Sequence, residues 1–412
     1  MWKIRGKVYD LTDFLDHHPG GRSILEASEG KDDLTATFES YHALCNMTKI
    51  ECIMKKYEIG VTEPSNFTFL DGGFYKTVQN RVRNCFASRS DYKANWLWGI
   101  KSLIQGGLYL TSFIGAFYSQ SLPIEYRMLL SILSGHLLIQ FGFGVMHDAS
   151  HGAVSNHPKV NQFLSATWNS LALWDGQLWA KHHVIRHHAF TGDQELDPDV
   201  IHFKPFIRKL EEEDEKKYWK IAKLYPKCVA LFTTCIFPGM FLGQGILYNL
   251  IWLRRGYMWK MKLPSLYTIS WYQTFIKLLM VFSFVYGSSF IVFFAYIMSA
   301  NMTYFACIMP DHDTFETHEN RINPKEEVDW GILQVRHSGN FATENPWICM
   351  LFGGINYQIE HHLFPTISHV HFHKIKPIVE ETCREFNVPY VSHKTVFDAI
   401  QSTLKNYSKN KK

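Results

Sequence analysis

The sequence has no strong excess of either charge, no closely paired cysteines and no apolar run behind its first residues. Its 412 residues carry a formal net charge of +4 without a basic, aromatic-interleaved patch, so we expect no nucleic-acid partner. The eight cysteines lack Cys-x-x-Cys spacing, which predicts free thiols in a reducing compartment and argues against a secreted disulfide framework. The missing apolar run predicts that there is no signal peptide.

Long apolar runs are few and are separated by polar segments. Hydrophobic residues make up 46% of the chain, yet the mean hydropathy is −0.13. Because about 20 apolar helical residues cross the hydrocarbon core of a bilayer, we expect four membrane-crossing helices, near 96–118, 126–146, 271–286 and 289–309. The apolar block 228–253 is predicted to be in-plane or re-entrant, since a full crossing would leave the four positive charges behind it in the lumen. Residues 1–95, 147–270 and 310–412 then share one face of the membrane.

Residues 1–62 are polar and are predicted to form a small soluble domain, followed by a linker at 63–95 and a membrane domain at 96–412. The segment His18-Pro19-Gly20-Gly21 predicts a tight turn that holds His18 at a loop edge, because proline fixes φ and glycine permits unusual φ values. His42 is predicted to lie at a helix end. Two such imidazoles could clamp a flat cofactor from both faces.

Two histidine clusters follow the second predicted crossing. His147 and His151 are spaced i and i+4, which places both on one side of an α-helix, and the same spacing relates His183 to His187. His188 is adjacent to the second pair. His182, five residues before His187, is expected to point elsewhere.

A third cluster lies near the C-terminus in Gln358-Ile359-Glu360-His361-His362. On a helix Gln358, His361 and His362 share one side, whereas Glu360 lies off it. Any one cluster is also compatible with an ordinary surface helix that carries histidines. Seven histidines on one face of the membrane together predict a metal site, and they exceed what a single ion needs, so we expect two metal ions.

Other polar residues near these clusters receive simpler interpretations. Asp148 is expected either to orient a histidine ring as a hydrogen-bond acceptor or to be a solvated acid. His136 is predicted to bond to a neighbouring helix, and His337 either to line a substrate entrance or to be structural. Solvent exposure is expected for the remaining histidines, namely His157, His202, His318, His369, His371, His373 and His393.

The N-terminal motif resembles that of cytochrome b5-type haem domains. The residues that carry the resemblance are Lys7-Val8-Tyr9-Asp10-Leu11-Thr12, the His-Pro-Gly-Gly turn and His42. The resemblance implies a small α+β domain, short at its N-terminus relative to the family, with haem b held between His18 and His42. Two axial histidines make a six-coordinate haem that is suited to electron transfer.

The three clusters, His-x-x-x-His, His-x-x-x-His-His and Gln-x-x-His-His, resemble the histidine boxes of membrane fatty-acid desaturases. Gln358 and the fused haem domain are similar to the front-end subgroup. The resemblance implies a multi-domain chain: an all-α polytopic membrane domain with about four transmembrane helices follows the haem domain. It also implies two non-haem Fe ions, with ligands at His147, His151, His183, His187, His188, His312, Gln358, His361 and His362.

The same resemblance implies an oxygen-dependent enzyme of the endoplasmic reticulum membrane, with its haem and iron sites facing the cytosol. It would insert a double bond between an existing one and the carboxyl end of a long acyl chain, carried as acyl-CoA or phospholipid. NADH-cytochrome b5 reductase would be the electron donor and O2 the oxidant. Two alternatives stay open: a sphingolipid long-chain-base desaturase or lipid hydroxylase on the same scaffold, or a non-enzymatic membrane haem- or metal-binding protein.

Overall fold

The computed structural model describes residues 1–30, 32–203, 257–258, 261–262, 270–287, 289–323 and 327–409. The block 228–253, predicted to be in-plane or re-entrant, lies outside the described residues. The positive charges at 254, 255 and 260, and residue 288 between the last two predicted crossings, also lie outside them.

The N-terminal domain combines a three-stranded antiparallel sheet with short helices around one small core. Its strands are ordered β1-β2-β3. Arg5 and Gly6, both with positive φ, form the two-residue turn between β1 and β2, as in the type I′ turns that are common in such hairpins. Trp2, Leu15 and Phe38 are buried in its core. The elements are β1 (Trp2–Ile4), β2 (Lys7–Tyr9), η1 (Thr12–His17), α1 (Arg22–Ser28), α2 (Thr35–Tyr41), α3 (Met47–Met54), η2 (Lys55–Tyr57) and β3 (Glu58–Val61).

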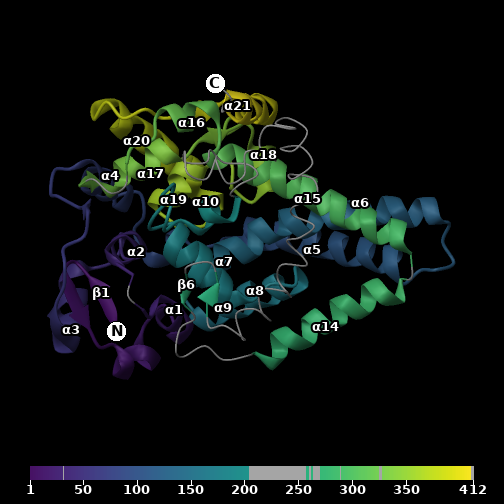
Figure 1. Ribbon diagram of the computed structural model, residues 1–412, viewed down its shortest axis with the longest axis horizontal. Helices are drawn as coiled ribbons and strands as arrows, with labels where there is room; N and C mark the ends of the chain where they lie inside the picture. The colour runs from purple at the N-terminus through teal and green to yellow at the C-terminus, as the bar shows by residue number, and fades with distance from the viewer. Residues whose placement is uncertain are drawn as a thin grey trace, which may run out of the picture.

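Four long apolar helices extend to one side of the molecule, away from the N-terminal domain (Figure 1). They are α5 (Trp96–Phe117), α6 (Ile124–Phe141), α14 (Trp271–Tyr286) and α15 (Phe290–His312). Helix α6 packs against both α5 and α15, and Gly135 permits the close approach of α15 because a Cβ there would collide with the backbone oxygen of Tyr296. Two continuous helical stretches, Ile124–Ser150 and Phe290–Glu319, are long and apolar enough to cross a membrane.

Most of the remaining elements lie around the C-terminal ends of α6 and α15. Between α5 and the N-terminal domain are β4 (Phe67–Thr68), α4 (Phe74–Arg83) and η3 (Arg89–Tyr92). After α6 come η4 (Gly142–His147), α7 (Asp148–Ser150), α8 (Pro158–Leu171), α9 (Gly176–Trp179), η5 (Ala180–His187), α10 (Pro198–Phe203), β5 (Tyr257–Met258) and β6 (Met261–Lys262). After α15 come α16 (Phe315–Glu319), β7 (Val328–Asp329), α17 (Trp330–His337), β8 (Asn340–Phe341), α18 (Pro346–Phe352), α19 (Gln358–Leu363), η6 (His369–His371), α20 (Phe372–Glu385), β9 (Ser392–His393) and α21 (Val396–Lys409).

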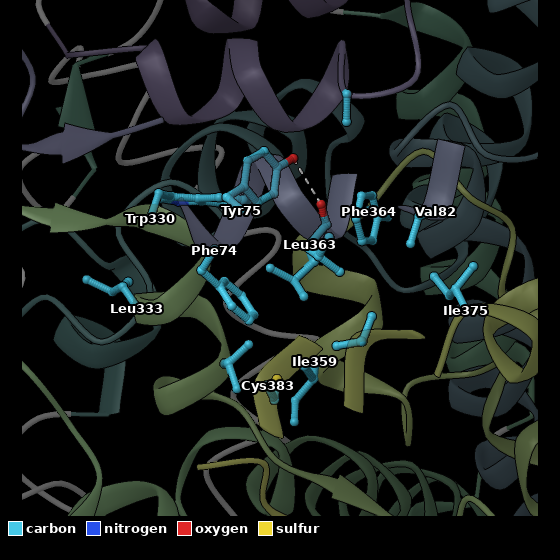
Figure 2. Close-up of a cluster of buried hydrophobic side chains, with 14 of the residues drawn as sticks. Phe74, Tyr75, Val82, Trp330, Leu333, Ile359, Leu363, Phe364, Ile375 and Cys383 are labelled. Carbon is cyan, nitrogen blue, oxygen red and sulfur yellow. Dashed lines mark hydrogen bonds between the residues drawn. The ribbon is translucent and has the colours of Figure 1, made fainter. Parts of the chain in front are cut away.

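A large apolar cluster fixes the short helix α19, which carries the third histidine cluster (Figure 2). Ile359 and Leu363 of α19 are fully buried there against α4, α17 and α20. The Tyr75 hydroxyl donates to the Leu363 carbonyl oxygen at 3.2 Å, and its ring meets that of Trp330 edge-on at 5.0 Å. Helix α4, within the segment 63–95 predicted to be a linker, therefore helps to position the candidate site.

Candidate haem and metal sites

His18 and His42 face each other at the ends of η1 and α2, with ring centroids 6.2 Å apart. Each Nδ1–H donates to a backbone carbonyl, His18 to Gly21 at 3.3 Å and His42 to Phe38 at 2.8 Å, which leaves both Nε2 atoms as potential ligands. Burial and the neighbouring His42 lower the pKa of His18 to about 4, so the ring is neutral at physiological pH. Two opposed neutral imidazoles fit the axial positions of a haem.

His147 ends a π-helical turn, η4, that continues α6, and His151 follows one turn later. Both imidazoles therefore lie directly beyond the end of the apolar helix α6, on the helical turns that continue it. π-Helical turns within α-helices often occur at functional sites. The two rings are buried, with centroids 4.7 Å apart.

The second cluster lies on a π-helical segment, η5, which brings a further pair of its histidines together. The rings of His183 and His187 stack with centroids 5.2 Å apart, in keeping with the predicted shared face. The wider turn, with i to i+5 hydrogen bonds, in addition brings His183 and His188 together, with Nε2 atoms 3.3 Å apart. His182 points elsewhere, as expected, and its Nε2 lies 2.6 Å from the Asp199 carboxylate.

The histidines converge into two main groups, each with nitrogen atoms within 4.8 Å of one another. The third cluster divides between them: His361 joins the first group and His362 the second. The first group is His147, His151, His183, His188 and His361, and the second is His187, His312 and His362. Asp199, which the sequence did not single out as a ligand, forms a further overlapping group with His183 and His187.

The short distances between imidazole nitrogens in the first group are better explained by a shared metal ion than by hydrogen bonds between the rings. The Nε2 atoms of His147 and His183 are 3.0 Å apart, and those of His188 and His361 are 3.1 Å apart. In each pair at most one nitrogen of a neutral ring can donate. Burial and the surrounding rings hold the pKa of His183, His188 and His361 well below 6.5. Unprotonated imidazole clusters of this kind suit Fe, Zn and Cu.

Gln358 lies within the second group. Its Nε2 is 2.9 Å from His312 Nε2 and 3.1 Å from His362 Nε2, whereas Oε1 has no hydrogen-bond partner among the described residues. The two ends of the amide group have nearly the same shape, so the side chain fits either way round. In the reverse orientation, the Gln358 oxygen would point at the same spot as the two ring nitrogens and could ligate a metal.

Acceptors behind the second group orient its rings. His187 Nδ1–H donates to Asp197 at 3.0 Å, His362 Nδ1–H to Gln334 Oε1 at 2.8 Å, and His312 Nδ1–H to the His337 carbonyl at 2.8 Å. These bonds direct each Nε2 inward, the arrangement expected of metal-ligating histidines. Sequence spacing does not reveal Gln334, which lies 28 residues from its partner.

Three side chains predicted to be solvated, or left open as solvated, are buried instead. Asp148 accepts hydrogen bonds from Ser368 Oγ and His369 Nδ1, both at 2.8 Å, so the solvated-acid interpretation is wrong. The ring that Asp148 orients is that of His369. Its Nε2 accepts a hydrogen bond from the Lys101 ammonium at 2.7 Å. His371 is bonded to the Lys93 carbonyl at 2.8 Å. Each partner is distant in sequence, which is why local polarity misled the prediction.

Two other histidines have structural partners. His136 Nδ1 is 2.8 Å from Thr303 Oγ1 on α15, which confirms the predicted bond between helices. His337 is buried; its Nδ1–H donates to the Thr191 carbonyl at 2.7 Å, and its Nε2 accepts from the Ile322 backbone N–H at 3.1 Å. These contacts fix the turn after His188 to α17.

Two family models match the chain. The fatty acid desaturase model matches residues 126–394, and the cytochrome b5-like haem/steroid-binding domain model matches residues 1–63. The chain is 28% identical to an acyl-lipid (8-3)-desaturase of Physcomitrium patens, over 98% of this chain and 87% of the relative. It is 28% identical to an acyl-lipid (8-3)-desaturase of Mortierella alpina, over 98% and 92%. It is 26% identical to a probable Delta(5) fatty acid desaturase C of Dictyostelium discoideum, over 98% and 90%.

These matches agree with the geometry. The desaturase model spans every histidine of both main groups, and the haem-domain model spans the opposed pair His18 and His42. The chain belongs to the fatty acid desaturase family and carries a cytochrome b5-like domain ahead of its helical desaturase domain.

Proposed function

We propose that this protein is an oxygen-dependent front-end desaturase that acts on long-chain polyunsaturated acyl groups at a pair of iron ions. The observation that carries the proposal is the convergence of the three histidine clusters into two adjacent groups. A protein that merely stores metal has no need of an adjoining haem domain, so the fused domain favours the redox enzyme over the non-enzymatic alternative.

The ligand assignment follows the two groups. We assign His147, His151, His183, His188 and His361 to one iron. His187, His312, His362 and Gln358 are assigned to the other. The close stacking of His188 on His362, with ring centroids 4.2 Å apart, supports two neighbouring ions. Asp199, whose group shares His183 and His187 with these sets, lies 3.4 Å from His187 Nδ1, the nitrogen that faces away from the second group. We therefore assign Asp199 a supporting role as an acceptor and not a place among the ligands.

Side chains alone do not break an unactivated C–H bond, so the protein's part is to bind the metal, orient its ligands and exclude water. Iron would supply the oxygen activation needed to break an unactivated C–H bond. The protein contributes neutral nitrogen donors, acceptors that fix their rings, and burial that excludes water. His188, His361 and His362 are each at most 3% exposed, so the reacting centre is shielded from solvent side reactions.

The haem domain supplies electrons in this proposal, with haem b held by His18 and His42. NADH-cytochrome b5 reductase is the proposed donor. The names of several relatives contain the words acyl-lipid, which favours a lipid-bound acyl chain over acyl-CoA as the substrate.

We further propose four membrane crossings, by α5, α6, α14 and α15, in the endoplasmic reticulum membrane with both cofactor sites in the cytosol. The apolar faces of α5 and α14 support the two additional crossings, since Leu103 is 78% exposed, Phe275 66% and Val285 71%. Such large apolar side chains favour lipid contact. The boundaries 1–62, 63–95 and 96–412 are retained for the haem domain, linker and membrane domain.

A protease site inserted within residues 254–262 is expected to be cut from outside sealed microsomes, because this topology places that segment in the cytosol. A site in the turn at 119–122 is the matched control and is expected to be protected. Protection of the 254–262 site would contradict the four-crossing topology.

The function itself is tested by feeding a panel of polyunsaturated fatty acids to yeast that express the protein. The new double bond is expected between an existing double bond and the carboxyl group, and mass spectrometry of the products locates it. Comparing phospholipid and acyl-CoA pools at early times identifies the carrier. A new bond on the methyl side, a modified long-chain base or a hydroxylated product would each contradict the front-end assignment.

A further inference from the structure

One hydrogen bond joins the haem domain directly to the candidate iron site. Helix α2 ends at Tyr41, and the next residue is the candidate haem ligand His42. The Tyr41 oxygen lies within hydrogen-bond distance of His151 Nδ1, 110 residues further along the chain. The two rings stack, with centroids 6.0 Å apart and planes inclined by 19°.

The opposite nitrogen of His151 faces the first histidine group. His151 Nε2 is buried and has no hydrogen-bond partner within the part of the chain that the structure describes. For Nε2 to donate its lone pair to a metal, Nδ1 must carry the hydrogen, so the Nδ1–H donates to the Tyr41 oxygen. The acceptors of His187 and His362 come from the desaturase domain, whereas that of His151 comes from the haem domain.

The contact belongs to an extended interface between the haem domain and η5. Val184 and Ile185 of η5 are fully buried within the core of the haem domain. The Thr37 hydroxyl of α2 donates to the Ile185 carbonyl at 3.2 Å. The Lys181 ammonium lies 3.5 Å from the Asp32 carboxylate. The helix end that carries Tyr41 is therefore held against a segment that carries metal-site histidines.

We propose that Tyr41 is a positioning residue of the iron site. Its oxygen accepts the hydrogen bond that orients His151, and this contact joins the haem domain to the metal centre. The inference rests on the proposed assignment of His151 as an iron ligand. In this arrangement, the path from the haem ligand to an iron ligand is His42, its neighbour Tyr41, one hydrogen bond and His151. Each desaturation, in which –CH2–CH2– + O2 + 2e⁻ + 2H⁺ gives –CH=CH– + 2H2O, draws two electrons along this path. The single haem supplies them one at a time: the loss of each electron oxidises ferrous haem to the ferric state, and the proposed reductase then reduces the haem again.

The test replaces Tyr41 by phenylalanine in the full-length holoprotein, which keeps the ring and removes only the acceptor oxygen. We expect the Tyr41→Phe variant to bind non-haem iron about 10- to 100-fold more weakly, the usual effect of losing the outer partner of a ligating histidine. Competition with an iron chelator measures this affinity. The haem Soret band is expected to be unchanged, and reoxidation of ferrous haem in the presence of O2 and acyl substrate is expected to be slower.

The matched control is Tyr57→Phe, which removes a hydroxyl from the same domain where the ring packs on Phe14 instead of on a metal-site histidine. Wild-type iron affinity in the Tyr41→Phe variant would overturn the inference, and so would loss of its Soret band, because the hydroxyl would then serve the fold of the haem domain. The His151→Ala variant tests separately whether His151 is an iron ligand and whether Tyr41 positions it. If it keeps full iron, the ligand assignment fails; if it loses iron while Tyr41→Phe does not, only this inference fails.

Discussion

Replacing His188 by alanine is expected to lower acyl desaturation by more than about 100-fold, beyond the loss usual for a residue that only supports a ligand. His188 lies where the two histidine groups meet. Its Nε2 is 3.3 Å from His183 Nε2 and 3.1 Å from His361 Nε2, and its ring stacks on His362. Removing it leaves the first group one nitrogen short and opens a void between the groups. Lipid analysis of yeast fed a polyunsaturated acid measures the effect.

The matched control for this variant is His157→Ala, which removes an exposed histidine just before α8 and is expected to leave conversion unchanged. Both variants should retain the haem Soret band, since neither residue lies in the haem domain. Persistent desaturation in the His188→Ala variant would refute the assignment of the histidine groups as the reaction centre.

Replacing His42 by alanine is expected to abolish the Soret band and, with it, NADH-driven desaturation by the purified protein. The ring of His42 faces that of His18 across 6.2 Å and is oriented by the Phe38 carbonyl, so no other described histidine can take its place at the end of α2. Loss of one axial ligand breaks the six-coordinate site that favours electron transfer. Absorption spectroscopy and a reconstituted assay with reductase measure the two effects.

His17→Ala is the control for this second variant, because His17 is exposed and adjacent to the proposed ligand His18. Adding a separate cytochrome b5 to the His42→Ala variant should restore part of the activity, since the iron site is left intact. A normal Soret band in the His42→Ala variant would show that the ligand pair is misassigned.

The sequence alone predicted which histidines the structure brings together at the two candidate sites, because most of them lie in short, dense motifs. His147 and His151 are one helical turn apart, and His361 and His362 are adjacent, so local spacing predicted their shared direction. The same holds for the His-Pro-Gly-Gly turn, in which a Cβ on Gly20 would lie 2.8 Å from the His18 ring. The long apolar helices were predictable for a similar reason, since membrane insertion depends on local composition.

Features that depend on distant contacts or on irregular helix geometry were not predictable. The π-helical segment η5 groups His183 with His188, which α-helical spacing does not suggest. His369 is buried because it bonds to Asp148, 221 residues away. The contact of Tyr41 with His151 spans two domains. No periodicity in the sequence encodes such pairs, because they arise only when separate elements pack together.

The most direct measurement of the central claim is the ratio of total iron to haem in the purified protein, in the wild type and in the His188→Ala variant. The account predicts two non-haem irons for each haem in the wild type and a clear loss of non-haem iron in the variant. A wild-type protein whose iron is entirely accounted for by its haem, or a variant with undiminished non-haem iron, would contradict it.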